Sequence, residues 1–179
     1  SYVHVLKRGA RGMEIVRDKS DMWRFVRLLY YMNDEYVNQY WESETKDKDI
    51  FYRPFGWPKK KNLVKVLAYC LMPNHFHLVL KEIKEGGVSL FMKKIGDSMT
   101  MSFNQKYNEK GSIFQGAYKS RTITEDVYFR YLAFYVMVKN PFELFPKNGL
   151  LGAVKNFDQA WDWIQKYQFC SIADYSGYR

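Results

Sequence analysis

The chain has 179 residues, and its 28 lysines and arginines outnumber its 19 aspartates and glutamates, for a formal net charge of +9. That length suits one domain with a substantial core, and a hydrophobic content of 47% excludes an intrinsically disordered chain. No apolar stretch approaches the roughly 20 residues of a membrane-spanning helix, and the first residues lack the apolar core of a signal peptide, so we expect a cytoplasmic protein without membrane contact. A basic surface favours nucleic acid as the partner, because binding releases counterions from the polyanion.

The first half of the chain alternates between strand and helix patterns. Residues 2–8 alternate as a strand does and then meet a glycine-rich turn. From Ser20, a suitable N-cap, apolar residues recur at helical spacing up to about Tyr40. The polar, proline-punctuated residues 42–62 indicate a surface excursion. The next twenty residues predict two strands, 63–72 and 75–82, joined by a turn at Pro73-Asn74.

The second half predicts two more helices and one more strand. A helix is expected from about Ser89 to Tyr107, a strand over 112–124, and a third helix from Glu125 to about Lys139, ended by Pro141. The order β-α-β-β-α-β is that of a ferredoxin-like α+β fold, an antiparallel sheet with helices on one face, here followed by a tyrosine-bearing helix and a tail. We expect a single domain over residues 1–179, with its core in 2–141 and a C-terminal helix and tail in 142–179.

Two of the three histidines stand one residue apart in the stretch "HFHLVL". On a strand, the side chains of His75 and His77 point to the same face, roughly 6 to 7 Å apart, while Phe76, Leu78 and Leu80 face a core. Two imidazoles on one side of a sheet can form half of a metal site. A hydrogen-bonded structural pair without a ligand is the alternative, and the motif alone does not separate the two.

Four motifs in a fixed order resemble a known family. They are "RG" after the first strand, "LMPNHFHLVL", "GSIFQGAYKS" and "YLAFYVMVKNP". Together they resemble the single-tyrosine HUH transposases of the insertion-sequence 200/605 family, and most closely the REP-associated tyrosine transposases. The resemblance runs from about Val3 to Pro141, and "YQFCSIADYSGYR" is similar to the Ser-Tyr-rich tail of the REP-associated branch. It implies an enzyme, a nuclease and strand transferase that acts on single-stranded or hairpin DNA.

The resemblance also implies a mechanism and the residues that carry it. In that family two histidines and a polar residue of the tyrosine helix hold one divalent ion, Mg²⁺ or Mn²⁺, which polarises the scissile phosphate. The helix tyrosine attacks this phosphate, so that a covalent 5′-phosphotyrosine forms and a free 3′-OH leaves. By this resemblance the metal ligands are His75, His77 and Asn140. The nucleophile is Tyr135, with Tyr131 as the second candidate.

The spacing after the tyrosine departs from the family pattern. The family places an Asn or Gln four residues after the tyrosine, whereas position 139 is Lys139 and Asn140 comes fifth. One explanation is a helix widened locally by a π-bulge, and another is a last turn distorted before Pro141. The third is that a water or another side chain completes the site. Lys139 is then expected near the phosphate, where its charge assists.

Basic residues near the expected sheet edges and the tyrosine are the candidates for DNA contact. They are Arg8, Arg11, Lys59, Lys60, Lys61, Lys119, Arg121 and Lys139. Lys119 and Arg121 are favoured, because "FQGAYKSR" resembles a stretch next to the active site in relatives. Trp57 is a candidate for base stacking, or else an anchor of the surface excursion. The sequence leaves open whether the protein is a monomer or a homodimer.

Three other functions remain open at this stage. A domesticated or inactive hairpin-DNA-binding protein of the same fold is the main one, and the displaced Asn140 favours it. An RNA-binding or single-strand-binding module of the RRM type is another, although such modules present aromatic residues rather than histidines on the sheet. The last is a metal-dependent hydrolase that uses no tyrosine.

Overall fold

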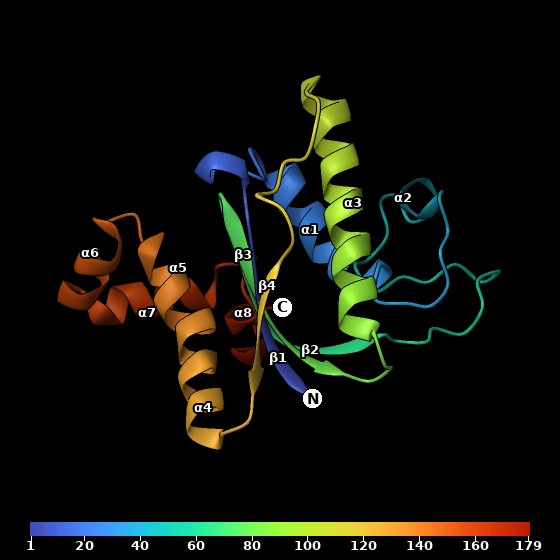
Figure 1. The fold of residues 1–179 in the computed structure, drawn as a ribbon. Coiled ribbons are helices and arrows are strands. Elements are labelled where there is room, and N and C mark those ends of the chain that lie inside the picture. Colours follow the sequence, from blue (N-terminus) through green and yellow to red (C-terminus); the bar gives the residue numbers. More distant parts are fainter.

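A four-stranded antiparallel sheet in the order β2-β3-β1-β4 forms the centre of the computed structural model, which describes residues 1–179. The strands are β1 (Tyr2–Arg8), β2 (Val64–Met72), β3 (His75–Glu82) and β4 (Lys119–Ile123). Helices cover both faces, with α1 and α3 on one side of the sheet and α4 to α7 on the other (Figure 1). This strand order confirms the predicted ferredoxin-like α+β arrangement.

The first face of the sheet packs against α1 (Lys19–Tyr31) and α3 (Gly87–Tyr107). Phe76, Leu78 and Leu80 of β3 are buried in this core, as the two-residue period of the strand predicted. Helix α3 begins two residues earlier than the predicted Ser89.

Helix α1 is shorter than predicted at its C-terminal end and is capped by a different residue. Its N-cap is Asp18, whose carboxylate accepts a hydrogen bond from the backbone N–H of Asp21, rather than Ser20. The helix ends at Tyr31 because the buried Asn33 turns toward β2. The Asn33 amide accepts from the N–H groups of residues 63 and 64 at 2.9 and 3.0 Å, and it donates to the carbonyl of residue 64 at 2.8 Å. This tertiary contact lies thirty residues away along the chain, so the helical pattern up to Tyr40 could not reveal it.

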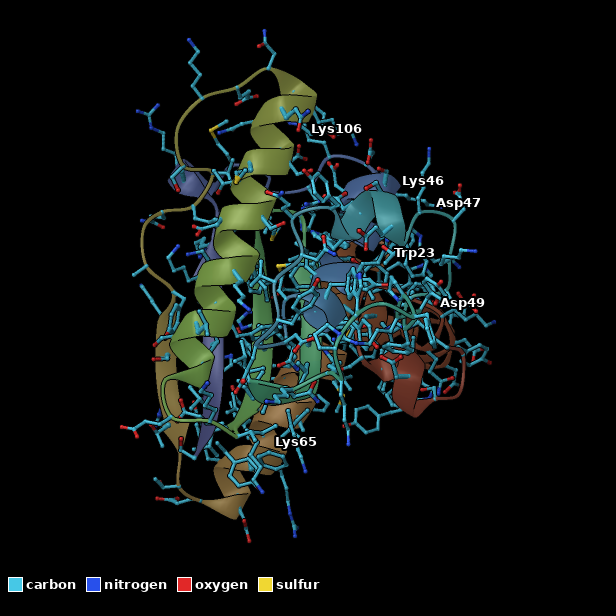
Figure 2. The ribbon with its side chains drawn as sticks, turned by 90° about the vertical axis from the view of Figure 1, so that its right-hand side faces the viewer. Trp23, Lys46, Asp47, Asp49, Lys65 and Lys106 are labelled. Carbon is cyan, nitrogen blue, oxygen red and sulfur yellow. The ribbon has the colours of Figure 1, made fainter.

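The excursion between α1 and β2 contains one short helix, α2 (Trp41–Glu44), and otherwise irregular backbone. It lies beside α1 and α3 (Figure 1). Lys46, Asp47 and Asp49 point outward from it into solvent (Figure 2). Its position on the surface confirms the prediction for residues 42–62.

The last strand is also shorter than predicted. Only residues 119–123 pair with β1, whereas 112–118 cross the surface as irregular backbone with one isolated bridge, from Phe114 to Gly9. Gly116 has φ +106°, a conformation outside the strand region, and its carbonyl accepts a hydrogen bond from Lys7.

The opposite face of the sheet carries the C-terminal third of the chain. A continuous helical segment runs through α4 (Asp126–Phe134), the π-helical η2 (Tyr135–Lys139) and α5 (Asn140–Glu143). The predicted stop at Pro141 is therefore wrong. A proline inside an α-helix removes one hydrogen bond and crowds the carbonyl four residues earlier. Here the wider π-turn precedes Pro141, and the thiol of Cys170 lies 3.7 and 3.8 Å from the carbonyl oxygens of Val136 and Met137.

The remaining residues form three helices rather than the predicted single helix and tail. They are α6 (Gly149–Lys155), α7 (Phe157–Gln165) and α8 (Ile172–Tyr175). Between α7 and α8 the chain pairs with β2, because Leu71 donates to the Phe169 carbonyl and Ser171 to the Tyr69 carbonyl, both at 2.9 Å. The tail thus completes a second core on this face. No helix is long and apolar enough to cross a membrane.

Candidate active site

Three histidines gather on the face of the sheet that α4 and η2 cover. The rings of His75 and His77 lie 5.1 Å apart between centroids and nearly perpendicular to each other. The third, His4 of β1, stacks on His77 with 5.2 Å between ring centroids, and 3.0 Å separates His4 Nε2 from His77 Nδ1. Antiparallel pairing of β1 with β3 creates this cluster, since it opposes Leu6 to His77 and His4 to Val79.

The neighbours of the two β3 histidines define which ring nitrogens are free. Asn74 donates its amide N–H to the Gly12 carbonyl, so its Oδ1, 2.6 Å from His75 Nδ1, accepts a hydrogen bond from the N–H at that ring nitrogen. His75 therefore keeps a lone pair on Nε2. If His77 Nδ1 donates to His4 Nε2, His77 also keeps its Nε2 lone pair. Hydrogen bonding of the second nitrogen in this way is typical of histidines that ligate metals.

Burial keeps these imidazoles neutral. His77 is only 3% exposed, and desolvation, reinforced by the charges of His75 and His4, lowers its pKa to about 3. Burial and the nearby Arg8 lower the pKa of His75, and burial and Arg121 lower the pKa of His4. Neutral imidazole is the form that binds a metal ion.

Tyr135 lies directly against this cluster. Its ring centroid is 5.5 Å from that of His77, in an edge-to-face arrangement. Tyr131 lies one turn earlier, with its ring 6.0 Å from that of Tyr135, and it is far more exposed. The structure thus brings the predicted nucleophile to the histidine face, and it places the second candidate next to it on the outer side.

The π-turn brings Asn140 to the same side of the helix as Tyr135. The backbone N–H of Asn140 bonds to the carbonyl of Tyr135, so the fifth residue occupies the turn position that the fourth residue has in an α-helix. Of the three explanations for the displaced Asn140, the first holds: the helix is widened by a π-turn over Tyr135–Lys139. The side chain is 1% exposed, and its Nδ2 has no hydrogen-bond partner. The Nδ2 group is a hydrogen-bond donor and therefore suits a water or a phosphate oxygen, whereas the amide oxygen is the atom that can ligate a cation.

The donor set fits a divalent ion that keeps part of its shell for other ligands. Two neutral imidazoles and one amide oxygen are available, and no three His, Cys, Asp or Glu side chains, the three histidines included, are arranged to hold an ion by themselves. Mg²⁺ and Mn²⁺ commonly retain several waters and bind substrate phosphate oxygens, which would fill the remaining positions.

Four of the predicted basic residues border this site. Arg8 lies opposite His75 in the β1–β3 register, and Lys119 and Arg121 project from β4 beside β1. The Arg121 guanidinium lies 4.3 Å from the centroid of the Tyr128 ring. Lys139 Nζ lies 5.0 Å from the centroid of the Tyr135 ring and forms an ion pair with Glu143.

The cluster Lys59–Lys61 is not part of this site. Lys60 donates to the carbonyls of Tyr30 and Asn33 at 2.6 and 2.5 Å, and burial lowers its pKa to about 8. It therefore closes the C-terminal end of α1, on the other face of the sheet. Lys59 and Lys61 flank it there. Arg11 is exposed in η1 (Ala10–Gly12), beside the turn that precedes His75.

From the sequence, Trp57 is a candidate either for base stacking or for anchoring the excursion, and His4 has no expected role. The indole N–H of Trp57 donates to Glu44, and its ring packs on Tyr31, so Trp57 anchors the excursion. The signal for His4 was present in the alternation of β1, which places Tyr2, His4 and Leu6 on one face. Only the register with β3 brings that face to His77.

Comparisons with known proteins now identify the family. The family model described as "Transposase IS200 like" matches residues 34–139, more than half of the chain. The chain therefore belongs to the IS200-like transposase family, which confirms the resemblance found in the sequence. The matched segment includes His75, His77 and Tyr135 and ends one residue before Asn140.

Two solved structures are similar to this chain at low identity. One is a REP-associated tyrosine transposase bound to a REP hairpin, with 13% identity over 78% of this chain and a TM-score of 0.48. This chain spans 65% of its length. The other is a candidate transposase from Deinococcus radiodurans R1, with 11% identity, a TM-score of 0.40, and coverage of 75% of this chain and 87% of that one. Among curated proteins no sequence matches.

Proposed function

We propose that the protein is a transposase that cuts and rejoins single-stranded DNA at hairpins through a covalent 5′-phosphotyrosine. Its family membership supports transposition as the process, and the basic border of the site supports DNA as the substrate. The observation that carries the mechanism is the Tyr135 ring 5.5 Å from the ring of His77, with the buried Asn140 one π-turn after Tyr135 on the same side of the helix.

In this proposal His75 and His77, through Nε2, and Asn140, through its amide oxygen, would hold one Mg²⁺ or Mn²⁺ ion. When bound, the ion withdraws charge from a phosphate oxygen and so favours attack at phosphorus. Tyr135 Oη gives its proton to solvent and forms the new bond to phosphorus, while the bond from phosphorus to the 3′ oxygen breaks and that oxygen takes a proton from solvent to leave as a 3′-OH. The reverse attack by a 3′-OH rejoins the strand and frees the tyrosine, so no external energy source is needed.

Lys139 would act as a fixed positive charge at this centre. The hydrogen bond to Glu143 raises the pKa of its ammonium above the usual value, so the group stays protonated at neutral pH. Its Nζ lies 5.0 Å from the centre of the Tyr135 ring. There it stabilises negative charge on the phenolic oxygen and on the phosphate, but it does not remove a proton.

The binding-only alternative loses its main argument in this structure. It depended on Asn140 being displaced by one residue, and the π-turn compensates for that displacement. The two functions differ in their products, because a binding-only protein binds the hairpin but forms no covalent protein–DNA adduct.

The test is a covalent-adduct assay. Wild-type protein incubated with a hairpin bearing single-stranded flanks, in Mn²⁺ or Mg²⁺, should give a protein–DNA adduct that survives denaturation. Tyr135→Phe should abolish the adduct, and Tyr131→Phe should retain it, because both variants keep the ring and lose only the hydroxyl. If the adduct survives in Tyr135→Phe and disappears in Tyr131→Phe, Tyr131 is the nucleophile. Hairpin binding without an adduct in either ion supports the binding-only protein.

A further inference from the structure

Three tyrosine rings follow one another along the helix that carries the proposed nucleophile. The ring centroids of Tyr128 and Tyr131 are 6.3 Å apart with planes 21° from parallel, and those of Tyr131 and Tyr135 are 6.0 Å apart at 33°. The spacing of three and four residues places all three on neighbouring positions of one helix surface. The row ends at His77, which contacts Tyr135.

Tyr131, the middle member of the row, does not belong to either hydrophobic core. Its side chain is 56% exposed, and its hydroxyl makes no hydrogen bond within the chain. Val127 and Phe134, on the same surface of α4, are 79% and 56% exposed. Folding of the protein therefore does not explain an aromatic ring at this position. Aromatic and apolar groups that stay exposed together usually mark a binding surface.

The charges around the tyrosine row are positive at both ends. Arg121 lies over the Tyr128 ring, and Lys139 lies over the Tyr135 ring. At the Tyr135 end, the carboxylate of Glu143 is paired with Lys139. At the other end Glu125 and Asp126 open α4, and they line a separate hollow with Tyr2 and Phe129. An aromatic surface between two cations complements a strand of nucleic acid, in which bases alternate with phosphates, better than it complements an apolar protein surface.

We infer that Tyr131 is a stacking surface for an unpaired base of the DNA strand held at Tyr135. This inference rests on the proposed function, since it assumes that a strand lies at the histidine cluster. Tyr131 is four residues before Tyr135, which is about 6 Å along the helix at 1.5 Å per residue. A base on Tyr131 therefore belongs to a nucleotide close to the cleaved phosphate. The neighbouring Tyr128 ring limits the rotation of Tyr131, and Arg121 and Lys139 are placed to contact phosphates on either side.

The experiment measures binding without chemistry. A DNA hairpin with unpaired flanks carries the fluorescent base 2-aminopurine in one flank, and a second hairpin has the same stem without flanks. Affinities are measured by fluorescence anisotropy in EDTA, so that no cleavage occurs, for wild type, Tyr131→Ala and Tyr131→Phe. Tyr40→Ala serves as the matched control, because Tyr40 is 62% exposed and its side chain makes no hydrogen bond, but it lies in the excursion beside α1.

Loss of one stacked base should weaken binding of the flanked hairpin by about 5- to 150-fold in Tyr131→Ala. Binding of the unflanked hairpin should not change, and Tyr131→Phe and Tyr40→Ala should behave as wild type. Quenching of 2-aminopurine on binding should disappear in Tyr131→Ala and persist in Tyr131→Phe.

Three results would overturn the inference. These are unchanged binding of the flanked hairpin, equal weakening of both hairpins, and a change of oligomeric state in Tyr131→Ala by sedimentation, which would make this surface a protein interface. Failure of the proposed function looks different. In that case the wild type forms no adduct with any divalent ion, whatever the outcome of the metal-free binding measurements.

Discussion

Replacing His4 by Phe should weaken binding of the divalent ion, although His4 is not among the proposed ligands. The Phe side chain keeps a flat ring against His77 but removes the nitrogen that lies 3.0 Å from His77 Nδ1. His77 then has two choices, and both are unfavourable for the ion. It can keep its proton on Nδ1 as a buried donor without an acceptor, or it can move the proton to Nε2 and lose the lone pair that faces the site.

The size of this effect follows from the burial of His77. The side chain is 3% exposed, so water does not replace the lost acceptor. A buried donor left without a partner costs about 1–3 kcal/mol. Loss of the hydrogen-bond partner of a metal-ligating residue typically lowers metal affinity by about 10- to 100-fold, which is roughly 1.4–2.8 kcal/mol. The two values agree, so we expect a decrease in Mn²⁺ affinity within that range.

The assay is a Mn²⁺ titration of the metal-free protein, followed by the electron paramagnetic resonance signal of the free ion. His4→Gln is the matched variant, since its amide oxygen restores an acceptor, and it should recover most of the affinity. Circular dichroism and thermal unfolding of both variants report whether the fold is intact. Equal Mn²⁺ affinity in wild type and a folded His4→Phe would refute the reasoning, because His77 would then not need His4 to present Nε2.

Three further predictions concern stability and DNA contact. The pKa of His77 is about 3 in the folded protein and near 6.5 in the unfolded chain, so between these values only the unfolded chain takes up the proton. The stability of the metal-free protein should fall by up to about 1.4 kcal/mol per pH unit below 6.5, and urea unfolding from pH 7 to 4 should show a shallower decline in His77→Gln. If the two slopes match, His77 is not buried in its neutral form. Lys60→Met should lower stability by about 1–3 kcal/mol and leave hairpin affinity unchanged, because its ammonium bonds to carbonyls at the end of α1. Lys119→Met should leave stability unchanged and reduce the slope of log hairpin affinity against log salt concentration by about 1. If Lys60→Met instead changes the salt slope and Lys119→Met instead lowers stability, the roles assigned to these two lysines are wrong.

The elements that the sequence predicted well depend on local patterns. Alternation along β3 and the turn at Pro73-Asn74 define β2 and β3 almost to the residue. The end of α1 depends instead on the bonds from Asn33 to β2, and the start of β4 depends on where the chain after α3 can reach β1. Such boundaries are set by contacts between segments far apart in the sequence, which periodicity within one segment does not contain.

The same distinction applies to the residues of the candidate site. The two-residue period of a strand is enough to place His75 and His77 on one face. The position of His4 requires the register between β1 and β3. Lys60 belongs to a basic run that resembles a DNA contact, and only its two carbonyl partners show that it supports α1. The sequence therefore shows which imidazole and ammonium groups are available, and the tertiary structure determines which residues each of them contacts.

The π-turn depends both on a neighbouring residue, Pro141, and on a residue distant in the sequence, Cys170. Pro141 has no N–H to offer the preceding turn, and in a regular α-helix its ring would crowd the carbonyl of Met137. Widening the turn relieves that contact, and the thiol of Cys170, 34 and 33 residues further along the chain, lies against the carbonyls of Val136 and Met137. The same widening moves Asn140 to the side of the helix that carries Tyr135. A tyrosine and an amide five residues apart can therefore share one site as closely as a pair four residues apart does in a regular helix, provided that Pro141 and Cys170 keep the turn open.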